Sequence, residues 1–119
     1  MSKNIIPVLC CKINRAGEFT PLLNLLDEGA VVTISQAQGD FYWQQAATAA
    51  VFVAAGSGIT PVAAMLLSQR HWLAPVSLFY RCRGSENAAL LSELTQLAAR
   101  QPLFTLTLSD SRTEPAETL

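Results

Sequence analysis

The chain has 119 residues, enough for one domain with its own core, and a formal net charge of −1. Half of the residues are hydrophobic and 14% are charged, and this balance favours neither nucleic acid nor an anionic membrane as a partner. The three cysteines, Cys10, Cys11 and Cys82, lack the spacing of metal ligands or of an iron–sulfur motif. Such a set is typical of a reducing, cytoplasmic location.

The first third of the chain predicts short strands and one helix. Residues 7–13 predict a strand, because β-branched side chains follow the proline without a breaker. Residues 20–26 predict a short helix with a Thr-Pro start, which offers either a second anion site or plain capping of the helix. Residues 30–35 and 41–43 predict two further strands, and the aromatic side chains of the second are typical of packing.

One apolar stretch in the centre organises the rest of the chain. Residues 51–55 predict a strand buried on both faces, since they form a short, uncharged apolar run rich in Val and Phe. Gly56 and Gly58 predict a tight turn that lets a ligand come close to the backbone. Thr60 and Pro61 predict the start of a helix, with the Thr60 side chain as its cap.

A strand, a glycine turn and a helix N-terminus together predict an anion site, because unpaired N–H groups and the helix dipole point at one spot. A pyrophosphate is the natural occupant. The site is not a P-loop, because no Lys follows the second glycine, and Pro61 replaces the third glycine of the common dinucleotide fingerprint. The alternative is an ordinary glycine turn between a strand and a helix.

Residues 46–67 carry no charge over a length that could span a bilayer. The glycine turn interrupts this run, so a buried strand followed by a core-facing helix explains it better than a membrane span. The helix is expected over residues 62–73, with Met65, Leu66 and Leu73 on one face.

The last third repeats the alternation of strand and helix. Residues 76–80 and 103–108 predict strands, and Ser85 predicts the cap of a helix that lies between them and ends near Arg100. Five of its apolar residues share one face: Leu90, Leu91, Leu94, Leu97 and Ala98. The order strand–helix–strand–helix–strand predicts an α/β fold, half of a Rossmann-like parallel sheet with right-handed crossovers.

In a parallel sheet, ligands collect at the carboxyl ends of the strands. These ends carry the central glycine turn and three arginines suited to phosphate: Arg81, Arg83 and Arg112. Solvated surface charges are the alternative for each arginine. Asp110, beside Ser111, would repel a phosphate and could accept a hydrogen bond from a free ribose hydroxyl instead.

Several motifs resemble the ferredoxin–NADP reductase family. The segment Gly-Ser-Gly-Ile-Thr-Pro at residues 56–61, after an apolar strand, is similar to the nicotinamide-nucleotide motif of that family. Gly39-Asp-Phe41 resembles the Gly-x-Phe of the family, and residues 79–83 with Glu93-Leu94 are similar to its second strand and helix. The resemblance implies part of a flavin-dependent NAD(P)H oxidoreductase that passes electrons through FAD to a protein or small acceptor. No side chain in the sequence is a convincing general acid or base.

The resemblance also implies a division into two domains. Residues 1–45 would be the C-terminal part of an FAD-binding barrel, and residues 46–119 the N-terminal part of an NAD(P)-binding domain. The nicotinamide nucleotide would be held by Gly56, Ser57, Gly58, Ile59, Thr60 and Pro61, with Arg81, Arg83, Ser111 and Arg112 as further phosphate ligands. Whether the nucleotide is NADH or NADPH stays open.

For the flavin, Gly17 and Thr20 resemble the family's pyrophosphate segment, although Glu18 opposes an anion there. The family's Arg-x-Tyr-Ser and Cys-Gly-Pro motifs are missing from the sequence. We therefore expect the chain alone to hold FAD weakly or not at all. The alternative function is a non-enzymatic binding or assembly module on a reductase-like scaffold, which would bind a redox partner or self-associate through an uncovered sheet edge.

Overall fold

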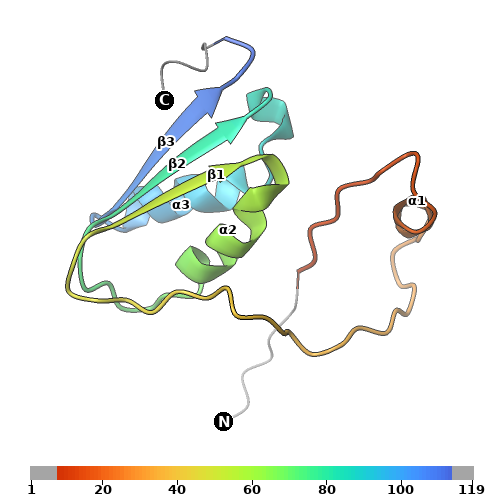
Figure 1. Ribbon diagram of the computed structural model, residues 1–119, viewed down its shortest axis with the longest axis horizontal. Coiled ribbons are helices and arrows are strands. Elements are labelled where there is room, and N and C mark those ends of the chain that lie inside the picture. The colour runs from red at the N-terminus through yellow and green to blue at the C-terminus, as the bar shows by residue number, and fades with distance from the viewer. Residues whose placement is uncertain (1–7, 114–119) are drawn as a thin grey trace. The chain divides into compact units, whose positions relative to one another are not determined.

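A computed structural model describes residues 8–113 of the chain (Figure 1). The chain divides into two compact units, Met1–Gln38 and Gly39–Leu119. In the described part of the first unit, one short helix, α1 (Thr20–Asn24), is surrounded by turns and loops. The helix expected over residues 20–26 is thus confirmed, in a shorter form.

The second unit contains a three-stranded, all-parallel sheet in the order β1-β2-β3. Its elements in chain order are β1 (Ala50–Ala55), a 3₁₀ turn (Gly56–Gly58), α2 (Ile59–Leu67), β2 (Val76–Cys82), a second 3₁₀ turn (Ser85–Asn87), α3 (Leu91–Arg100) and β3 (Phe104–Asp110). This order confirms the predicted α/β fold, half of a Rossmann-like nucleotide-binding sheet.

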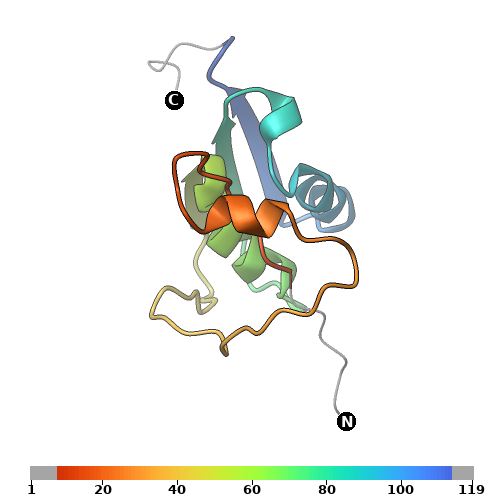
Figure 2. The same cartoon turned by 90° about the vertical axis from the view of Figure 1, so that its right-hand side faces the viewer.

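The core lies between the sheet and its two helices. Because each β–α–β crossover is right-handed, α2 and α3 pack on the same face of the sheet (Figures 1 and 2). The largest fully buried side chains of this core come from both the sheet and the helices: Tyr80, Ile59, Leu66, Leu78, Leu94 and Val76. Each buried Leu or Ile contributes about 1.5–3 kcal/mol relative to exposure.

The other face of the sheet is open in the described structure, which corrects one expectation. The prediction that β1 is buried on both faces is wrong, because Val51 and Val53 are 68% and 73% exposed. Their neighbour on β2, Phe79, is also exposed. The reason is topological: both crossovers place their helices on one face, and within the described residues of the second unit no other element covers the opposite face.

The strands expected over residues 8–13, 30–35 and 41–43 are absent, and these segments are loop. Pro7 lies outside the described residues. A strand exists only through pairing, and the described backbone offers these segments no partner strand. Their apolar side chains, such as Val31 and Ile34, are correspondingly exposed. The assignment of residues 1–45 to a flavin-binding barrel therefore stays a prediction.

Helix α2 ends at Leu67, not at residue 73 as the periodicity suggests. The side chain of Gln45 explains the early end, because it fixes the following loop at two points. Its amide Nε2 donates to the carbonyl oxygen of His71 at 2.6 Å, and its Oε1 accepts from the N–H of Leu73 at 3.0 Å. Met65 and Leu66 are buried as expected, whereas Leu73 is exposed.

Helix α3 begins at Leu91, and the prediction that Ser85 caps it is wrong. Ser85 opens a separate 3₁₀ turn, and its side chain makes no capping hydrogen bond. The residue before α3 is Leu90, whose φ of 60° puts it in the left-handed region. The end of the helix is as expected, since Arg100 lies in the last turn.

None of the helices in the described part of the chain is long and apolar enough to cross a membrane. The uncharged run over residues 46–67 instead contains β1 and α2, as expected. Within residues 8–113, no group of three or more His, Cys, Asp or Glu side chains is close enough together to hold a metal ion.

Candidate nucleotide-binding site

The carboxyl ends of the three strands meet at one edge of the sheet (Figure 1). The register aligns Ala55, Arg81 and Ser109 in one row across β1, β2 and β3. This row and the segments that directly follow it carry all of the predicted nucleotide-site residues of the second unit. The parallel topology thus gathers, at one edge, residues that are far apart in the sequence.

The glycine turn after β1 is open toward solvent. Gly56 has a φ of 56°, which an L side chain rarely adopts, so the backbone itself requires glycine there. Gly58 has an ordinary helical φ of −64°. A Cβ added to either glycine would meet no atom within 4 Å. The conformation of Gly58 therefore does not require glycine.

Helix α2 starts differently from the prediction. Its N-cap is Gly58, no side chain caps it, and Thr60 lies inside the first turn, so the predicted Thr60 cap is wrong. Ile59 is fully buried and anchors this turn in the core, while its N–H points back to the carbonyl of Gly56. The 3₁₀ turn Gly56–Gly58 leads directly into α2, so the positive end of the helix dipole lies at this turn.

The two arginines at the end of β2 differ in their surroundings. Arg81 is half-buried, and its Nη1 donates to the hydroxyl of Ser109 on β3 at 3.0 Å. Arg83 is exposed, and its carbonyl accepts from the amide of Asn87 at 2.9 Å. Arg83 is therefore the more accessible of these two phosphate candidates.

Arg112, the predicted phosphate ligand after β3, is held by two carboxylates. Its Nη1 and Nη2 donate to Oε1 and Oε2 of Glu86 at 2.6 and 2.9 Å, and Nη2 lies 3.4 Å from Oδ2 of Asp110. We call Glu86, Asp110 and Arg112 the carboxylate clamp. Its neighbour Ser111 is exposed, and the Ser111 N–H bonds the Cys82 carbonyl at 2.8 Å, which extends the sheet by one link.

The clamp shifts the pKa of each of its members toward the charged form. The hydrogen bond from Arg112 lowers the pKa of Glu86. The backbone N–H of Arg112 is the main cause of the lowered pKa of Asp110. Hydrogen bonds to Glu86 and then Asp110 raise the pKa of Arg112. All three groups are thus charged at neutral pH.

Cys82, the last residue of β2, is buried beside this edge. Burial is the main cause of the raised pKa of its thiol, and the carboxylates of Asp110 and Glu86 raise it further. The Sγ atom donates to the carbonyl of Ser109 at 3.7 Å. A protonated, enclosed thiol is a poor nucleophile, which agrees with a packing role.

In the first unit, Gly17 and Thr20 lie in one closed loop. The hydroxyl of Thr20 accepts from the N–H of Asn14 at 2.8 Å, and the N–H of Gly17 donates to the Asn14 carbonyl at 2.9 Å. Thr20 does not cap α1, whose N-cap is Phe19, so that capping prediction is wrong. A flavin pyrophosphate here would have to displace the bond to Asn14, and this contact stays a proposal.

Glu86 and Gly84 are the residues of this edge that sequence reasoning missed as site residues. A glycine two residues after a strand does signal an unusual turn, and Gly84 has a φ of 89°. Nothing in the sequence pairs Glu86 with Arg112, which lies 26 residues further on. The parallel register of β2 and β3 creates that pair.

A hollow of about 400 Å³ lies between the carboxyl ends of α2 and α3. Its lining contains no sequence-predicted site residue: Leu67, Gln69, Arg70, Trp72, Leu97, Arg100 and Gln101. These helix ends are at the sheet edge opposite to the glycine turn, so the hollow is separate from the candidate site.

An open parallel α/β sheet with a glycine turn and a helix N-terminus at its carboxyl edge defines a nucleotide-binding domain. Residues 52–118, more than half of the chain, match the family described as the oxidoreductase NAD-binding domain, and the chain belongs to this family. This match confirms the resemblance to the ferredoxin–NADP reductase family.

One relative supports the same assignment. Phenoxybenzoate dioxygenase subunit beta from Ectopseudomonas oleovorans is 39% identical to this chain over 66 residues. The aligned residues make up 56% of this chain and 21% of that protein. The match thus spans about a fifth of the relative's length.

Proposed function

We propose that this chain supplies the nicotinamide-nucleotide site of an oxidoreductase that passes electrons from NAD(P)H through a flavin to an acceptor. The observation that carries the proposal is the open glycine turn between β1 and α2 at the carboxyl edge of the sheet. The family match adds that the domain is of the NAD-binding type. The flavin and the acceptor are parts of the proposal, drawn from the family resemblance.

Within this site, the backbone N–H groups at the start of the glycine turn would hold the pyrophosphate, aided by the positive end of the α2 dipole. The space above Gly56 and Gly58 leaves room for the phosphate oxygens to come close to the backbone. The Thr60 hydroxyl, which does not cap α2, would be a further donor. Arg83 would add a charge from the end of β2.

The chemistry of the reaction belongs to the nucleotide, which supplies a hydride when it is bound. The role of this chain's residues is to bind and orient. We assign no general acid or base, because the side-chain bonds at the carboxyl ends of the strands anchor side chains and loops to one another.

Titrating the chain with NADH and with NADPH, followed by the fluorescence of its two tryptophans, tests the proposal. The Gly58→Ala variant should weaken binding by roughly tenfold, about 1.4 kcal/mol, because its Cβ would occupy the space through which the phosphate oxygens approach the backbone. Ala64→Ser is the matched control, because it adds one heavy atom to an exposed position of the same helix. No response of the wild type to either nucleotide at millimolar concentration would overturn the proposal.

A second candidate function rests on the open face of the sheet. Val51, Val53 and Phe79 form an exposed apolar surface, whereas parallel sheets are usually covered on both faces. A binding or assembly module on this scaffold would use that surface to self-associate or to hold a partner. Size-exclusion chromatography with light scattering, together with a hydrophobic-dye binding assay, separates the two candidates. A monomer that binds no dye would remove the support for a module.

A further inference from the structure

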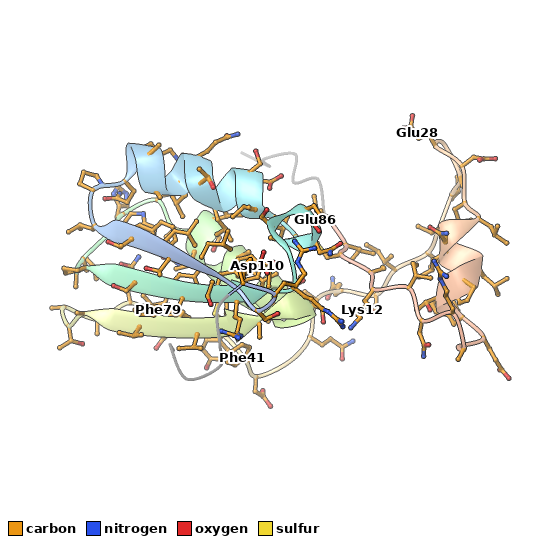
Figure 3. The ribbon with its side chains drawn as sticks, turned by 90° about the horizontal axis from the view of Figure 1, so that it is seen from above. Lys12, Glu28, Phe41, Phe79, Glu86 and Asp110 are labelled. Atoms are coloured by element: carbon orange, nitrogen blue, oxygen red, sulfur yellow. The ribbon has the colours of Figure 1, made fainter. Side chains whose placement is uncertain are left out.

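The carboxylate clamp occupies the part of the edge where a bound nucleotide would place its adenosine end. The pyrophosphate would sit on the turn after β1, and β3 is the second strand along from it. Strands are spaced by about 4.8 Å, so the clamp lies roughly 10 Å along the edge from the turn. Glu86 and Asp110 both lie at this end of the sheet (Figure 3).

The clamp is held by the backbone as well as by its ion pairs. Asp110 Oδ1 accepts from the N–H of Gly84 at 3.0 Å and from the N–H of Arg112 at 2.9 Å, which ties the loop after β2 to the end of β3. A Cβ on Gly84 would collide with the guanidinium of Arg112 and would lie 2.6 Å from Oε1 of Glu86. The guanidinium therefore rests on the bare backbone of this glycine.

This arrangement changes what the edge offers to a ligand. Three guanidinium–carboxylate contacts already occupy Arg112, the cation closest to the end of β3. Carboxylates are pure acceptors and can pair with the donor hydroxyls of a ribose. A 2′-phosphate carries about −1.5 to −2 charges, so it would be repelled by Glu86 and Asp110 and would have to compete with them for Arg112.

We propose that Glu86 is a specificity-determining residue that, by clamping Arg112, makes this site prefer NADH over NADPH. The proposal rests on the nucleotide-binding function proposed above and adds the class of nucleotide. Asp110 positions the clamp through its two backbone bonds, while Glu86 supplies the two shortest contacts to the guanidinium. Without Glu86, Arg112 would be released to meet a phosphate.

The test compares dissociation constants of NADH and NADPH for the full chain and for Glu86→Gln, at low and at high salt. Wild type should bind NADH more tightly. The substitution should shift the ratio toward NADPH by roughly threefold to tenfold, a modest factor because solvent screens exposed charges. Adding Arg112→Gln to Glu86→Gln should remove the gain, and high salt should reduce it.

Glu93→Gln is the matched control, since it removes the same charge from an exposed position on α3 and should leave the ratio unchanged. Adenosine 2′,5′-bisphosphate should displace NADH from Glu86→Gln at lower concentration than from wild type. If the wild type binds neither nucleotide, the proposed function fails. If it binds NADH but Glu86→Gln leaves both the ratio and the displacement unchanged, only the role of Glu86 is overturned.

Discussion

The hydroxyl of Tyr80 donates a hydrogen bond to the carbonyl of Ala89 at 3.0 Å, one residue before the left-handed Leu90. A bulky residue in that backbone region costs about 1–2 kcal/mol, so the surrounding structure must hold it in place. Tyr80 is 1% exposed and reaches this segment from the middle of the core. The start of α3 is therefore fixed from β2, without any capping side chain.

Tyr80→Phe should consequently destabilise the chain by about 1–3 kcal/mol, because it leaves the Ala89 carbonyl without this donor. Urea unfolding followed by circular dichroism measures the change. Tyr42→Phe is the control, since Tyr42 is exposed and its loss of a hydroxyl should change nothing measurable. Equal effects of the two substitutions would contradict the role assigned to Tyr80.

The two glycines of the central turn should respond to alanine in opposite ways. Gly56→Ala puts a side chain at a φ of 56° and should cost about 1–2 kcal/mol of stability. Gly58→Ala meets a φ of −64° and open space, so stability should stay the same or rise by up to about 1 kcal/mol. Thermal unfolding of both variants checks this. A loss of stability in Gly58→Ala would show that the backbone requires this glycine after all.

Combined with the binding test, the pair separates folding from function. Gly58→Ala is expected to fold stably but to bind the nucleotide weakly. Weak binding by Gly56→Ala would instead combine a loss of stability with a loss of nucleotide contact. The prediction thus depends on the open space over the turn.

The fold was predictable from sequence where a signal is local. The apolar runs of β2 and β3 and the leucine spacing around Leu94 and Leu97 fix those elements, because burial against one face sets their period. The strand predictions for segments 8–13 and 30–35 were wrong for a different reason. A β-branched composition favours a strand, but a strand forms only when its backbone pairs with another. Likewise, the end of α2 depends on Gln45, which lies outside the helix.

The candidate site divides in the same way. The glycine turn is visible in the sequence because turn, strand and helix are contiguous. The clamp is not, because Glu86 and Arg112 meet only through the register of two parallel strands. From the sequence, Arg112 is expected to be free to bind a phosphate. In the structure, Glu86 and Asp110 already pair with its guanidinium.

The clamp should also give the chain a defined pH dependence. The pKa of Glu86 is lowered from its ordinary 4.5 by Arg112, so the folded state binds protons less readily than the unfolded chain. Its stabilisation is therefore complete above about pH 4.5 and is lost as the pH falls through the lowered value. The difference in melting temperature between wild type and Glu86→Gln should shrink as the pH is taken from 7 to 3. A difference that grows on acidification would contradict this sign.

The three thiols should react at different rates. Cys10 and Cys11 are exposed, whereas Cys82 is buried and has a raised pKa. A thiol reagent such as DTNB should modify two sulfurs quickly in the native chain and the third only after unfolding. Cys82→Ser should leave the fast phase unchanged. Loss of part of the fast phase in that variant would show that Cys82 is accessible.

The last prediction concerns the flavin, which we expect the purified chain to hold poorly. The described candidate contact is the loop at Gly17 and Thr20, where the Thr20 hydroxyl already bonds to Asn14. Helix α1 has five residues and no side-chain cap. Even a full helix N-terminus contributes only about 0.3–1 kcal/mol to anion binding. Micromolar affinity needs roughly 8 kcal/mol.

The visible spectrum checks this directly, first as purified and again after incubation with excess FAD and desalting. We expect well under one equivalent of retained flavin in both cases. Thr20→Ala tests the loop itself, because it removes the hydroxyl that bonds to the Asn14 N–H and adds no anion-binding group. A flavin band near one equivalent in the wild type would contradict this expectation.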